Sequence, residues 1–161
     1  MPNLRPVTLD DLPGAPITIT TEVDIVASRQ RAFDLFSGDP ARWGRFHTAL
    51  DDKGRWISET PDGVGSVRRI GNGRVDFIET ILAKDNGRRW AFRVDKATLP
   101  MARAMIEDYV FEDAPNGCTL HWTAGIWPIG PAAIARPVLT VALTRLIGQI
   151  AGGVERIAAN G

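Results

Sequence analysis

Apolar and polar residues alternate along the first patterned segment of the chain. Between residues 17 and 25, odd positions carry mainly isoleucine and valine, and even positions carry threonine, glutamate and aspartate. This period of two predicts a half-buried strand. Helical spacing follows, with Ser28 as the predicted N-cap of a short helix. Asp39 and Pro40 are typical of a second helix start, and that helix is predicted to run through Phe46.

Three Asn-Gly pairs mark the turns of a predicted antiparallel meander. They are Asn72-Gly73, Asn86-Gly87 and Asn116-Gly117, and such pairs favour two-residue hairpin turns because these turns need a positive φ. The second turn predicts three cross-strand pairs on one face: Ala83 with Trp90, Ile81 with Phe92, and Glu79 with Val94. The first turn predicts two further pairs: Ile70 with Val75, and Arg68 with Phe77. This register places Arg68 diagonal to Glu79.

The third turn separates two alternating sets that any even-length loop places on one face: Met105, Glu107, Tyr109 and Phe111, and Leu120, Trp122, Ala124 and Ile126. A long helix is then predicted after Pro131, ending at about Ala158. Its apolar residues form a single stripe at helical spacing: Leu139, Leu143, Leu146, Ile147, Ile150, Val154 and Ile157. We expect this stripe to lie on the concave face of the sheet, which is the available apolar surface.

The two ends of the chain set the predicted domain limits. Residues 1–16 contain four prolines and no periodicity, so we interpret them as a loosely ordered extension. Residues 17–161 are predicted to form one domain, a length that suits a single hydrophobic core. The apolar stretch from Pro137 to Val154 is interrupted by Arg145 and Gln149. We therefore expect no integral membrane association.

Composition excludes several classes of function. Lys+Arg and Asp+Glu both count 19, and this balance argues against a nucleic-acid binder, which normally has a basic excess. Cys118 is the sole cysteine, and His47 and His121 show no metal-ligand spacing. No metal or cofactor is predicted. The absence of disulfides and the lack of a signal-peptide pattern at the N-terminus favour a cytoplasmic location.

Four segments together resemble the START-like (SRPBCC) superfamily, in its polyketide cyclase/dehydrase-like branch. They are VDIVASRQRAFDLFSGDPARWGRFH, DGVGSVRRIGNGRVDFIETI, RRWAFRV and NGCTLHWTAGIWPIGP. The resemblance covers roughly residues 17–159. It implies an α+β helix-grip fold, in which a curved antiparallel sheet of about seven strands wraps round a long C-terminal helix, with two short helices after the first strand. It also implies a cavity between sheet and helix. Members of the family bind lipids, sterols, polyketides or plant hormones, and some catalyse cyclisation or dehydration.

Two carboxylates are the candidate catalytic groups. The predicted register places Glu79 and Glu107 on the concave, otherwise apolar face, where burial raises a carboxyl pKa toward the range of a general acid or base. The alternative is that each is solvated or paired with Arg68 or Arg93. Arg68 itself is a candidate for gripping a ligand carboxylate, and its alternative is a structural pair with Glu79.

The predicted ligand-binding set combines Arg68 with aromatic residues of the concave face and two leucine-stripe positions: Arg68, Phe77, Trp90, Phe92, Tyr109, Phe111, Trp122, Leu143 and Ile147. Aromatic residues of this kind line ligand pockets, but they also form ordinary cores. Trp56 belongs to the same aromatic set. Tyr109, the sole tyrosine, could orient a ligand carbonyl. His47 is placed near the cavity mouth, His121 is predicted to point outward, and Cys118 is predicted to be inert.

Three functional hypotheses follow in order of preference. The first is the binding of a small hydrophobic molecule of lipid, polyketide or aromatic type between the sheet and the long helix. The second is a cyclase or dehydratase that uses Glu79 or Glu107 as acid or base, with Arg68 or Tyr109 polarising a carbonyl. The third is an interaction module with a collapsed cavity, including the possibility of a homodimer.

Overall fold

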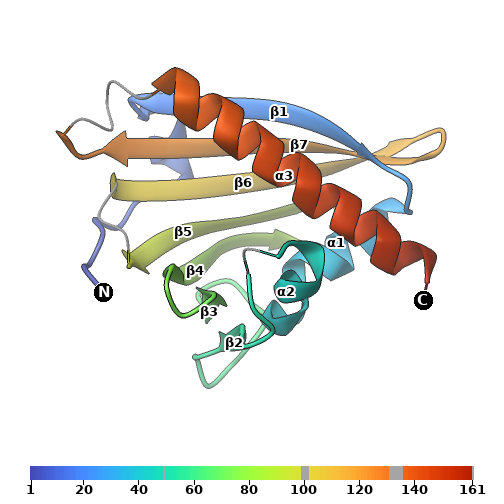
Figure 1. Cartoon of the computed structure of the whole chain (residues 1–161), viewed down its shortest axis with the longest axis horizontal. Helices are drawn as coiled ribbons and strands as arrows, with labels where there is room; N and C mark the ends of the chain where they lie inside the picture. The colour runs from blue at the N-terminus through green and yellow to red at the C-terminus, as the bar shows by residue number, and fades with distance from the viewer. Residues whose placement is uncertain (49, 99–101, 131–135, 161) are drawn as a thin grey trace.

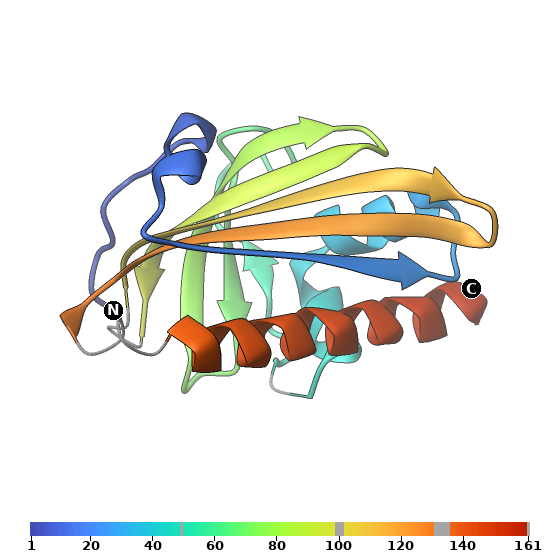
Figure 2. The ribbon, with the colours of Figure 1, turned by 90° about the horizontal axis from the view of Figure 1, so that it is seen from above.

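A computed structural model describes residues 1–161 except 49, 99–101, 131–135 and 161. Across this described part of the chain, seven antiparallel strands form one sheet in the order β1-β7-β6-β5-β4-β3-β2. The strands are β1 (Ile17–Ile25), β2 (Arg55–Trp56), β3 (Val67–Gly71), β4 (Asp76–Asp85), β5 (Arg89–Ala97), β6 (Ala102–Ala114) and β7 (Gly117–Pro128). The sheet curves around the C-terminal helix (Figures 1 and 2). The strand count and the curvature agree with the predicted helix-grip fold.

Two short helices follow the first strand, as predicted. α1 (Arg29–Ser37) begins after Ser28, whose hydroxyl accepts a hydrogen bond from the N–H of Arg31 at 3.2 Å. A 3₁₀ turn, η2 (Pro40–Arg42), leads into α2 (Trp43–Phe46). It begins at Asp39, whose carboxylate accepts from the N–H of Ala41 at 3.0 Å. Both predicted caps are therefore confirmed, and they fix the two helices at one end of the sheet (Figure 1).

The long helix α3 (Arg136–Ala159) lies across the concave face of the sheet (Figures 1 and 2). Its predicted stripe is confirmed, because Ile147, Ile150 and Val154 are buried in the core. By length and composition α3 is the one helix in the described residues that could cross a membrane. Its apolar stripe packs on the sheet instead, so α3 serves as the core helix.

The helix also comes very close to α2 at one point. A Cβ atom added to Gly153 would lie 2.2 Å from the carbonyl oxygen of Phe46, a distance that no side chain could occupy. Glycine at this position therefore permits the backbone of α3 to contact the end of α2. That contact holds the α2 side of the core against the helix.

The β4–β5 hairpin has the predicted register away from its turn but not next to the turn. Two predicted pairs are present: Ile81 with Phe92, and Glu79 with Val94. The third is wrong, since Trp90 pairs with Lys84 rather than with Ala83. The loop has three residues, 86–88, with Gly87 at a φ of 71°. A bulge at Leu82 inserts one residue into β4 and cancels the shift that this odd loop introduces.

The predicted register of the β3–β4 hairpin was wrong by two residues. Arg68 lies directly opposite Glu79, and Phe77 pairs with Ile70. The loop spans four residues, 72–75, because the Asn72 side chain accepts hydrogen bonds from the N–H groups of Arg74 and Val75, both at 2.9 Å. A shift of two residues leaves every side chain on its predicted face. It changes only the partners.

The β6–β7 hairpin has the even loop that the pattern requires. Ala114 pairs with Gly117 across a two-residue turn, and Tyr109 pairs with Trp122. The two predicted sets of inward residues therefore share one face.

The N-terminal segment, predicted to be loosely ordered, packs on the convex face of the sheet. The N–H of Leu4 donates to the Asp95 carbonyl at 2.8 Å, and Val7 is buried with Ala104 and Ile106. A 3₁₀ helix, η1 (Leu9–Gly14), follows. Apolar side chains on the outer face of β6 supply the surface that this segment packs against, and the segment's own pattern does not show that surface.

Candidate functional site

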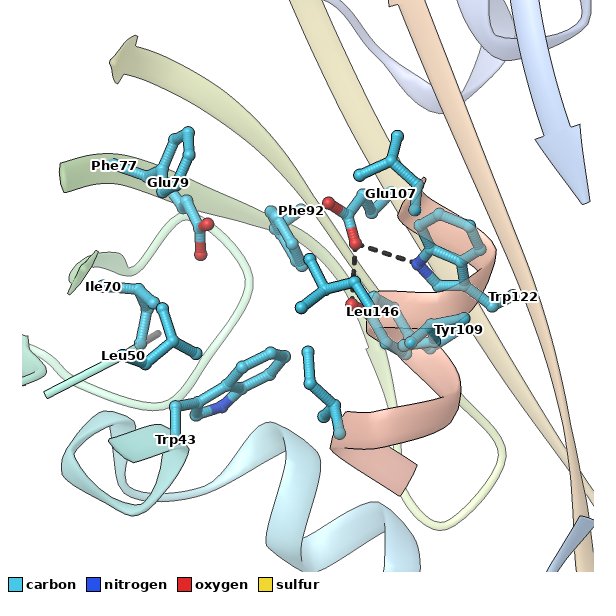
Figure 3. Close-up of a pocket in the computed structure, with 13 residues that line it drawn as sticks. Trp43, Leu50, Ile70, Phe77, Glu79, Phe92, Glu107, Tyr109, Trp122 and Leu146 are labelled. Atoms are coloured by element: carbon cyan, nitrogen blue, oxygen red, sulfur yellow. Dashed lines mark hydrogen bonds between the residues drawn. The ribbon is translucent and has the colours of Figure 1, made fainter. Parts of the chain in front are cut away.

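A cavity of about 100 Å³ lies between α3 and the concave face of the sheet. Its walls come from β3–β7, α2, α3 and the segment after α2 (Figure 3). The lining residues are Trp43, Leu50, Ile70, Phe77, Glu79, Phe92, Glu107, Tyr109, Trp122, Leu143, Leu146, Ile147 and Ile150. All but a few of these side chains are apolar. The polar groups in the lining that bear on function are the carboxylates of Glu79 and Glu107, and the Tyr109 hydroxyl and Trp122 indole N–H that donate to Glu107.

Arg68 is fully buried next to this cavity but does not line it. Its Nε and Nη2 atoms are both 2.7 Å from Oε2 of Glu79. Its guanidinium carbon also lies 4.4 Å from the ring centroid of Trp90, 4.8 Å from that of Trp43 and 4.9 Å from that of Phe92. Three aromatic faces and one carboxylate therefore surround the cation, an arrangement that compensates for its lost hydration.

Glu79 combines burial with an ion pair. Burial raises the pKa of its carboxyl group to about 7, and the opposing effect of the nearby Arg68 guanidinium does not cancel this shift. The charge of Glu107 raises the same pKa further, so the two carboxylates sense each other across the cavity. A carboxyl group with a pKa near neutrality can both accept and donate a proton.

Glu107 has hydrogen-bond donors around it, and none of the described residues places a cation in contact with it. Its Oε2 atom accepts from the Tyr109 hydroxyl at 2.7 Å and from the Trp122 indole N–H at 2.9 Å (Figure 3). Burial raises the pKa of Glu107, and these two hydrogen bonds act against that rise. Burial also holds the pKa of Tyr109 well above its usual value, so this hydroxyl stays protonated.

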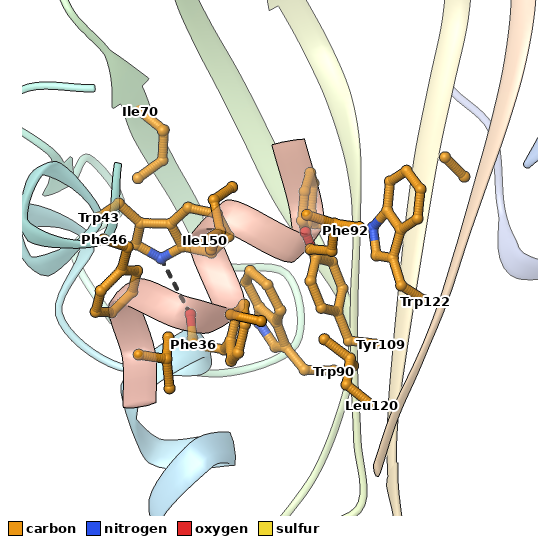
Figure 4. Packing of buried hydrophobic residues seen from close by; sticks show 14 of the residues in the cluster. Phe36, Trp43, Phe46, Ile70, Trp90, Phe92, Tyr109, Leu120, Trp122 and Ile150 are labelled. Atoms are coloured by element: carbon orange, nitrogen blue, oxygen red, sulfur yellow. Dashed lines mark hydrogen bonds between the residues drawn. The ribbon is translucent and has the colours of Figure 1, made fainter. Parts of the chain in front are cut away.

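Several residues predicted to bind ligand form the core behind the cavity. Trp90 is completely buried, and its ring centroid is 5.0 Å from those of Phe92 and Tyr109 (Figure 4). Phe111 packs edge-on against Phe33 at 5.9 Å. Trp90, Phe111 and Arg68 therefore lie outside the lining, while the other six predicted ligand-binding residues are in it.

The remaining candidates lie away from the cavity. His47 contacts Gln149 of α3 at 2.7 Å, between Nε2 and Oε1. His121 points outward, as predicted, and lies 3.1 Å from Glu22. Cys118 is buried, and burial raises its pKa to about 11, which keeps the thiol protonated. Arg93, considered as a partner of Glu79, pairs with Asp95 instead.

No group of three or more His, Cys, Asp or Glu side chains in the described residues is arranged to hold a metal ion.

Residues 16–160 match the family described as polyketide cyclase / dehydrase and lipid transport. The chain belongs to this family. It is 31% identical over 141 residues to the uncharacterized protein Rv2574 of Mycobacterium tuberculosis, covering 84% of this chain and 83% of that protein.

Solved structures share the fold of this family member. Ara h 8.0201 superposes with a TM-score of 0.73 at 14% identity, over 89% of this chain and 98% of the other. A START superfamily protein from Mycobacterium smegmatis gives a TM-score of 0.71 at 12% identity, over 89% of this chain and 97% of that one. At these identities the likeness shows the helix-grip fold alone.

Sequence reasoning missed five of the residues that line the cavity of this polyketide cyclase-like chain: Trp43, Leu50, Ile70, Leu146 and Ile150. Leu146 and Ile150 belong to the predicted stripe of the long helix, so helical phase indicated their face. Trp43 and Leu50 come from α2 and the segment after it, and no local pattern shows that this segment closes one side of the cavity.

Proposed function

We propose that this protein binds a small hydrophobic molecule of lipid, polyketide or aromatic type between α3 and the sheet. The observation that carries the proposal is an apolar cavity that contains two carboxylates and lies where the fold leaves space between helix and sheet. The family description, which names both cyclisation and lipid transport, supports a hydrophobic ligand.

The size of the cavity limits what enters without rearrangement. At about 100 Å³ it is below the range of roughly 300–1,000 Å³ typical of drug-sized ligands. It is comparable to apolar cavities that accept a molecule of about benzene size. A longer polyketide or lipid chain therefore requires Leu146 of α3, or the segment that carries Leu50, to move outward.

Native mass spectrometry of the purified protein, followed by solvent extraction, tests this function directly. An apolar adduct at one molecule per chain, lost on denaturation, supports binding and gives the ligand class. Toluene titration followed by tryptophan fluorescence serves when the protein is isolated without an adduct.

Leu146→Trp fills the cavity and should abolish toluene binding. Val141→Trp is the matched control, since Val141 is on the same helix and 63% exposed. Equal toluene binding by both variants and the wild type would refute the proposed site.

A second candidate function is acid–base catalysis by the same cavity. The observation that favours it is that burial raises the pKa of both Glu79 and Glu107, and that both side chains line the same largely apolar cavity. One carboxyl group could remove a proton from an enolisable ligand, and the Tyr109 hydroxyl would bind the ligand's carbonyl oxygen only after giving up its hydrogen bond to Glu107. In a catalyst the bound molecule is chemically changed.

The extracted ligand distinguishes the two functions. Incubation with wild-type protein should convert it only if the protein is an enzyme, and Glu107→Gln should then bind it without conversion. Recovery of unchanged ligand from the wild type would leave binding as the function. An interaction module with a collapsed cavity receives less support because the cavity is open, and a cytoplasmic location stays a prediction.

A further inference from the structure

The polar groups that line the cavity are unequal in hydrogen-bonding capacity. The lining side chains carry three N–H or O–H donors, and each already donates within the protein. Trp43 Nε1 donates to the Phe36 carbonyl at 3.1 Å, and Tyr109 and Trp122 both donate to Oε2 of Glu107. While both carboxyl groups are ionised, no lining side chain in the described residues therefore has a donor left for a ligand.

The carboxylates of Glu79 and Glu107, in contrast, each use only one of their two acceptor oxygens within the described part of the protein. The hydrogen bonds and the ion pair of Glu79 and Glu107 within the described residues all involve Oε2. Oε1 of each carboxylate has no hydrogen-bond partner among the described residues, and both side chains lie in the wall of the cavity (Figure 3). A bound molecule thus meets two free acceptor atoms.

The charges next to the cavity also disfavour a ligand anion. Arg68 neutralises one carboxylate at most, and its guanidinium is enclosed by Glu79 and three aromatic rings. Its Nη1 atom has no hydrogen-bond partner in the described residues, but Arg68 does not line the cavity. A ligand anion would lose its hydration and meet two ionised carboxylates and no free donor in the lining, which is strongly unfavourable.

Resting on the proposed function, we propose that the cavity selects apolar ligands that carry a hydrogen-bond donor, a hydroxyl or ammonium group, and rejects carboxylates and phosphates. The donor binds to the free oxygens of Glu79 and Glu107, and the hydrocarbon part packs against Phe92, Trp122 and Leu146. The sequence-based expectation that Arg68 grips a ligand carboxylate is thereby replaced.

Four probes with one ring scaffold test this selectivity: toluene, benzyl alcohol, benzylamine and benzoate. Binding is measured at about pH 8.5, above the raised pKa of Glu79, from the NMR shifts of the Trp43 and Trp122 indole N–H groups. We expect benzyl alcohol and benzylamine to bind at least about tenfold more tightly than benzoate, the scale of one hydrogen bond to a charged group. Benzoate binding as tightly as benzyl alcohol would overturn the proposal.

Glu107→Gln is the matched variant for the same titrations. The amide oxygen of the new side chain can keep both hydrogen bonds from Tyr109 and Trp122, while its NH₂ group adds a donor to the cavity. Benzoate should then bind about tenfold more tightly and benzylamine about tenfold more weakly than to the wild type. An unchanged ratio of the two affinities would contradict the assigned role of Glu107.

The toluene titration tests ligand binding by the cavity separately from its selectivity for hydrogen-bond donors. Saturable toluene binding together with equal affinity for all four probes would remove the selectivity and leave the binding function intact. Failure of toluene and of all three polar probes to bind would remove the binding function, and the selectivity with it.

A second site is indicated by four arginines on the surface. Arg31 of α1, Arg42 of η2, Arg45 of α2 and Arg156 of α3 line one hollow together with Leu35, Ile157 and Asn160. The lining contains no carboxylate, and none of these four arginines has an ion pair in the described residues. The whole chain has no net charge, so this positive cluster is a local feature.

We infer that this hollow binds a phosphate-type anion, either free or as the headgroup of a lipid. Guanidinium groups match phosphate oxygens in geometry and charge, and four like charges held together leave a positive potential that an anion relieves. This site lies outside the cavity lining, since none of its residues lines the cavity. It does not depend on what the cavity binds.

Calorimetric titration with phenyl phosphate, and sedimentation with vesicles of phosphatidylcholine with or without phosphatidic acid, test this site. We expect saturable phenyl phosphate binding that the double variant Arg42→Gln/Arg156→Gln weakens at least about tenfold. Arg74→Gln, in the β3–β4 loop, is the control and should bind as the wild type does.

The vesicle arm identifies the source of the anion. Phenyl phosphate binding with capture by phosphatidic acid vesicles indicates a lipid headgroup, and binding without capture indicates a free phosphate compound. No saturable binding at millimolar phenyl phosphate, or equal weakening by Arg74→Gln, would overturn the inference.

Discussion

Arg68 and Glu79 lie directly opposite each other in the β3–β4 hairpin, with both Nε and Nη2 of the arginine 2.7 Å from one carboxylate oxygen. Both side chains are buried, and Nη1 of Arg68 has no hydrogen-bond partner in the described residues. Each charge therefore depends on the other. The three aromatic rings around the guanidinium contribute the rest of its compensation.

Glu79→Leu should accordingly be one of the most destabilising single changes in the chain. It leaves the buried Arg68 cation without its partner, and loss of one partner of a buried pair costs about 3–5 kcal/mol. Urea unfolding followed by tryptophan fluorescence measures the change in the free energy of unfolding.

The double variant Arg68→Met/Glu79→Leu is the control for this interaction. Replacing both charges by apolar side chains removes the unpaired charge, so we expect it to recover most of the stability lost in Glu79→Leu. If the double variant were less stable than the single variant, Arg68 would stabilise the fold even without Glu79, and this account would be wrong.

Glu107 predicts how stability changes with pH. Burial raises the pKa of Glu107 and of Glu79 in the folded protein, so the folded state binds more protons than the unfolded state between the ordinary carboxyl pKa and the raised value. The free energy of unfolding should therefore fall as pH rises through this window, which for Glu79 extends to a pKa of about 7.

Glu107→Gln removes one of the two titrating groups while its amide oxygen can still accept from Tyr109 and Trp122. We expect its unfolding free energy to fall less steeply than that of the wild type when urea titrations at about pH 5 and about pH 8 are compared. Parallel profiles for the two proteins would mean that Glu107 has an ordinary pKa in the folded state.

The face of each inward residue could be predicted from the sequence, but the partners of the charged residues could not. Alternation alone placed Glu79, Glu107 and Tyr109 toward the helix, and the structure agrees. The direct opposition of Arg68 and Glu79 was missed because the Asn72 side chain closes a four-residue loop in place of a two-residue turn. A register shift of two residues leaves each side chain on the same face of the sheet but changes its cross-strand partner.

The surroundings of Arg68 depend on contacts between distant segments. Trp43 comes from α2, while Trp90 and Phe92 come from β5. No local pattern connects these rings to one guanidinium. The sequence indicated each as apolar and inward, but only the packed fold shows that they enclose a cation and take it away from any ligand.

Two glycines of α3 provide a matched test of how the helix packs. A Cβ atom at Gly153 would lie 2.2 Å from the Phe46 carbonyl oxygen, whereas at Gly148 it would meet nothing within 4 Å. Gly153→Ala should therefore destabilise the protein, by about 1–3 kcal/mol as for overpacking. Gly148→Ala should stabilise it by about 0.5–1 kcal/mol because alanine is the better helix former.

Thermal unfolding of both alanine variants measures these opposite shifts. No loss of stability in Gly153→Ala would show that α3 does not contact α2 in this way, and a loss in Gly148→Ala would show that the space beside Gly148 is not open.

Trp122 and Tyr109 should control the pKa of Glu107 through their hydrogen bonds. Both donate to Oε2 of the carboxylate, and both bonds oppose the rise in its pKa that burial causes. Trp122→Phe removes one donor and leaves the ring-sized apolar surface largely in place. Because a hydrogen bond to the charged form stabilises it, the pKa of Glu107 should rise further in this variant.

Carbon-13 NMR of the Glu107 carboxyl group measures this pKa directly in the wild type and in the variant. Tyr109→Phe removes the other donor without a change of ring size, and it should raise the same pKa. His121→Gln, on the outer face next to Trp122 in sequence, is the control and should leave it unchanged. A Glu107 pKa that does not respond to either donor, or that responds equally to His121→Gln, would show that the two bonds do not govern its charge. In that case the cavity's preference for ligand donors would have to rest on Glu79 alone.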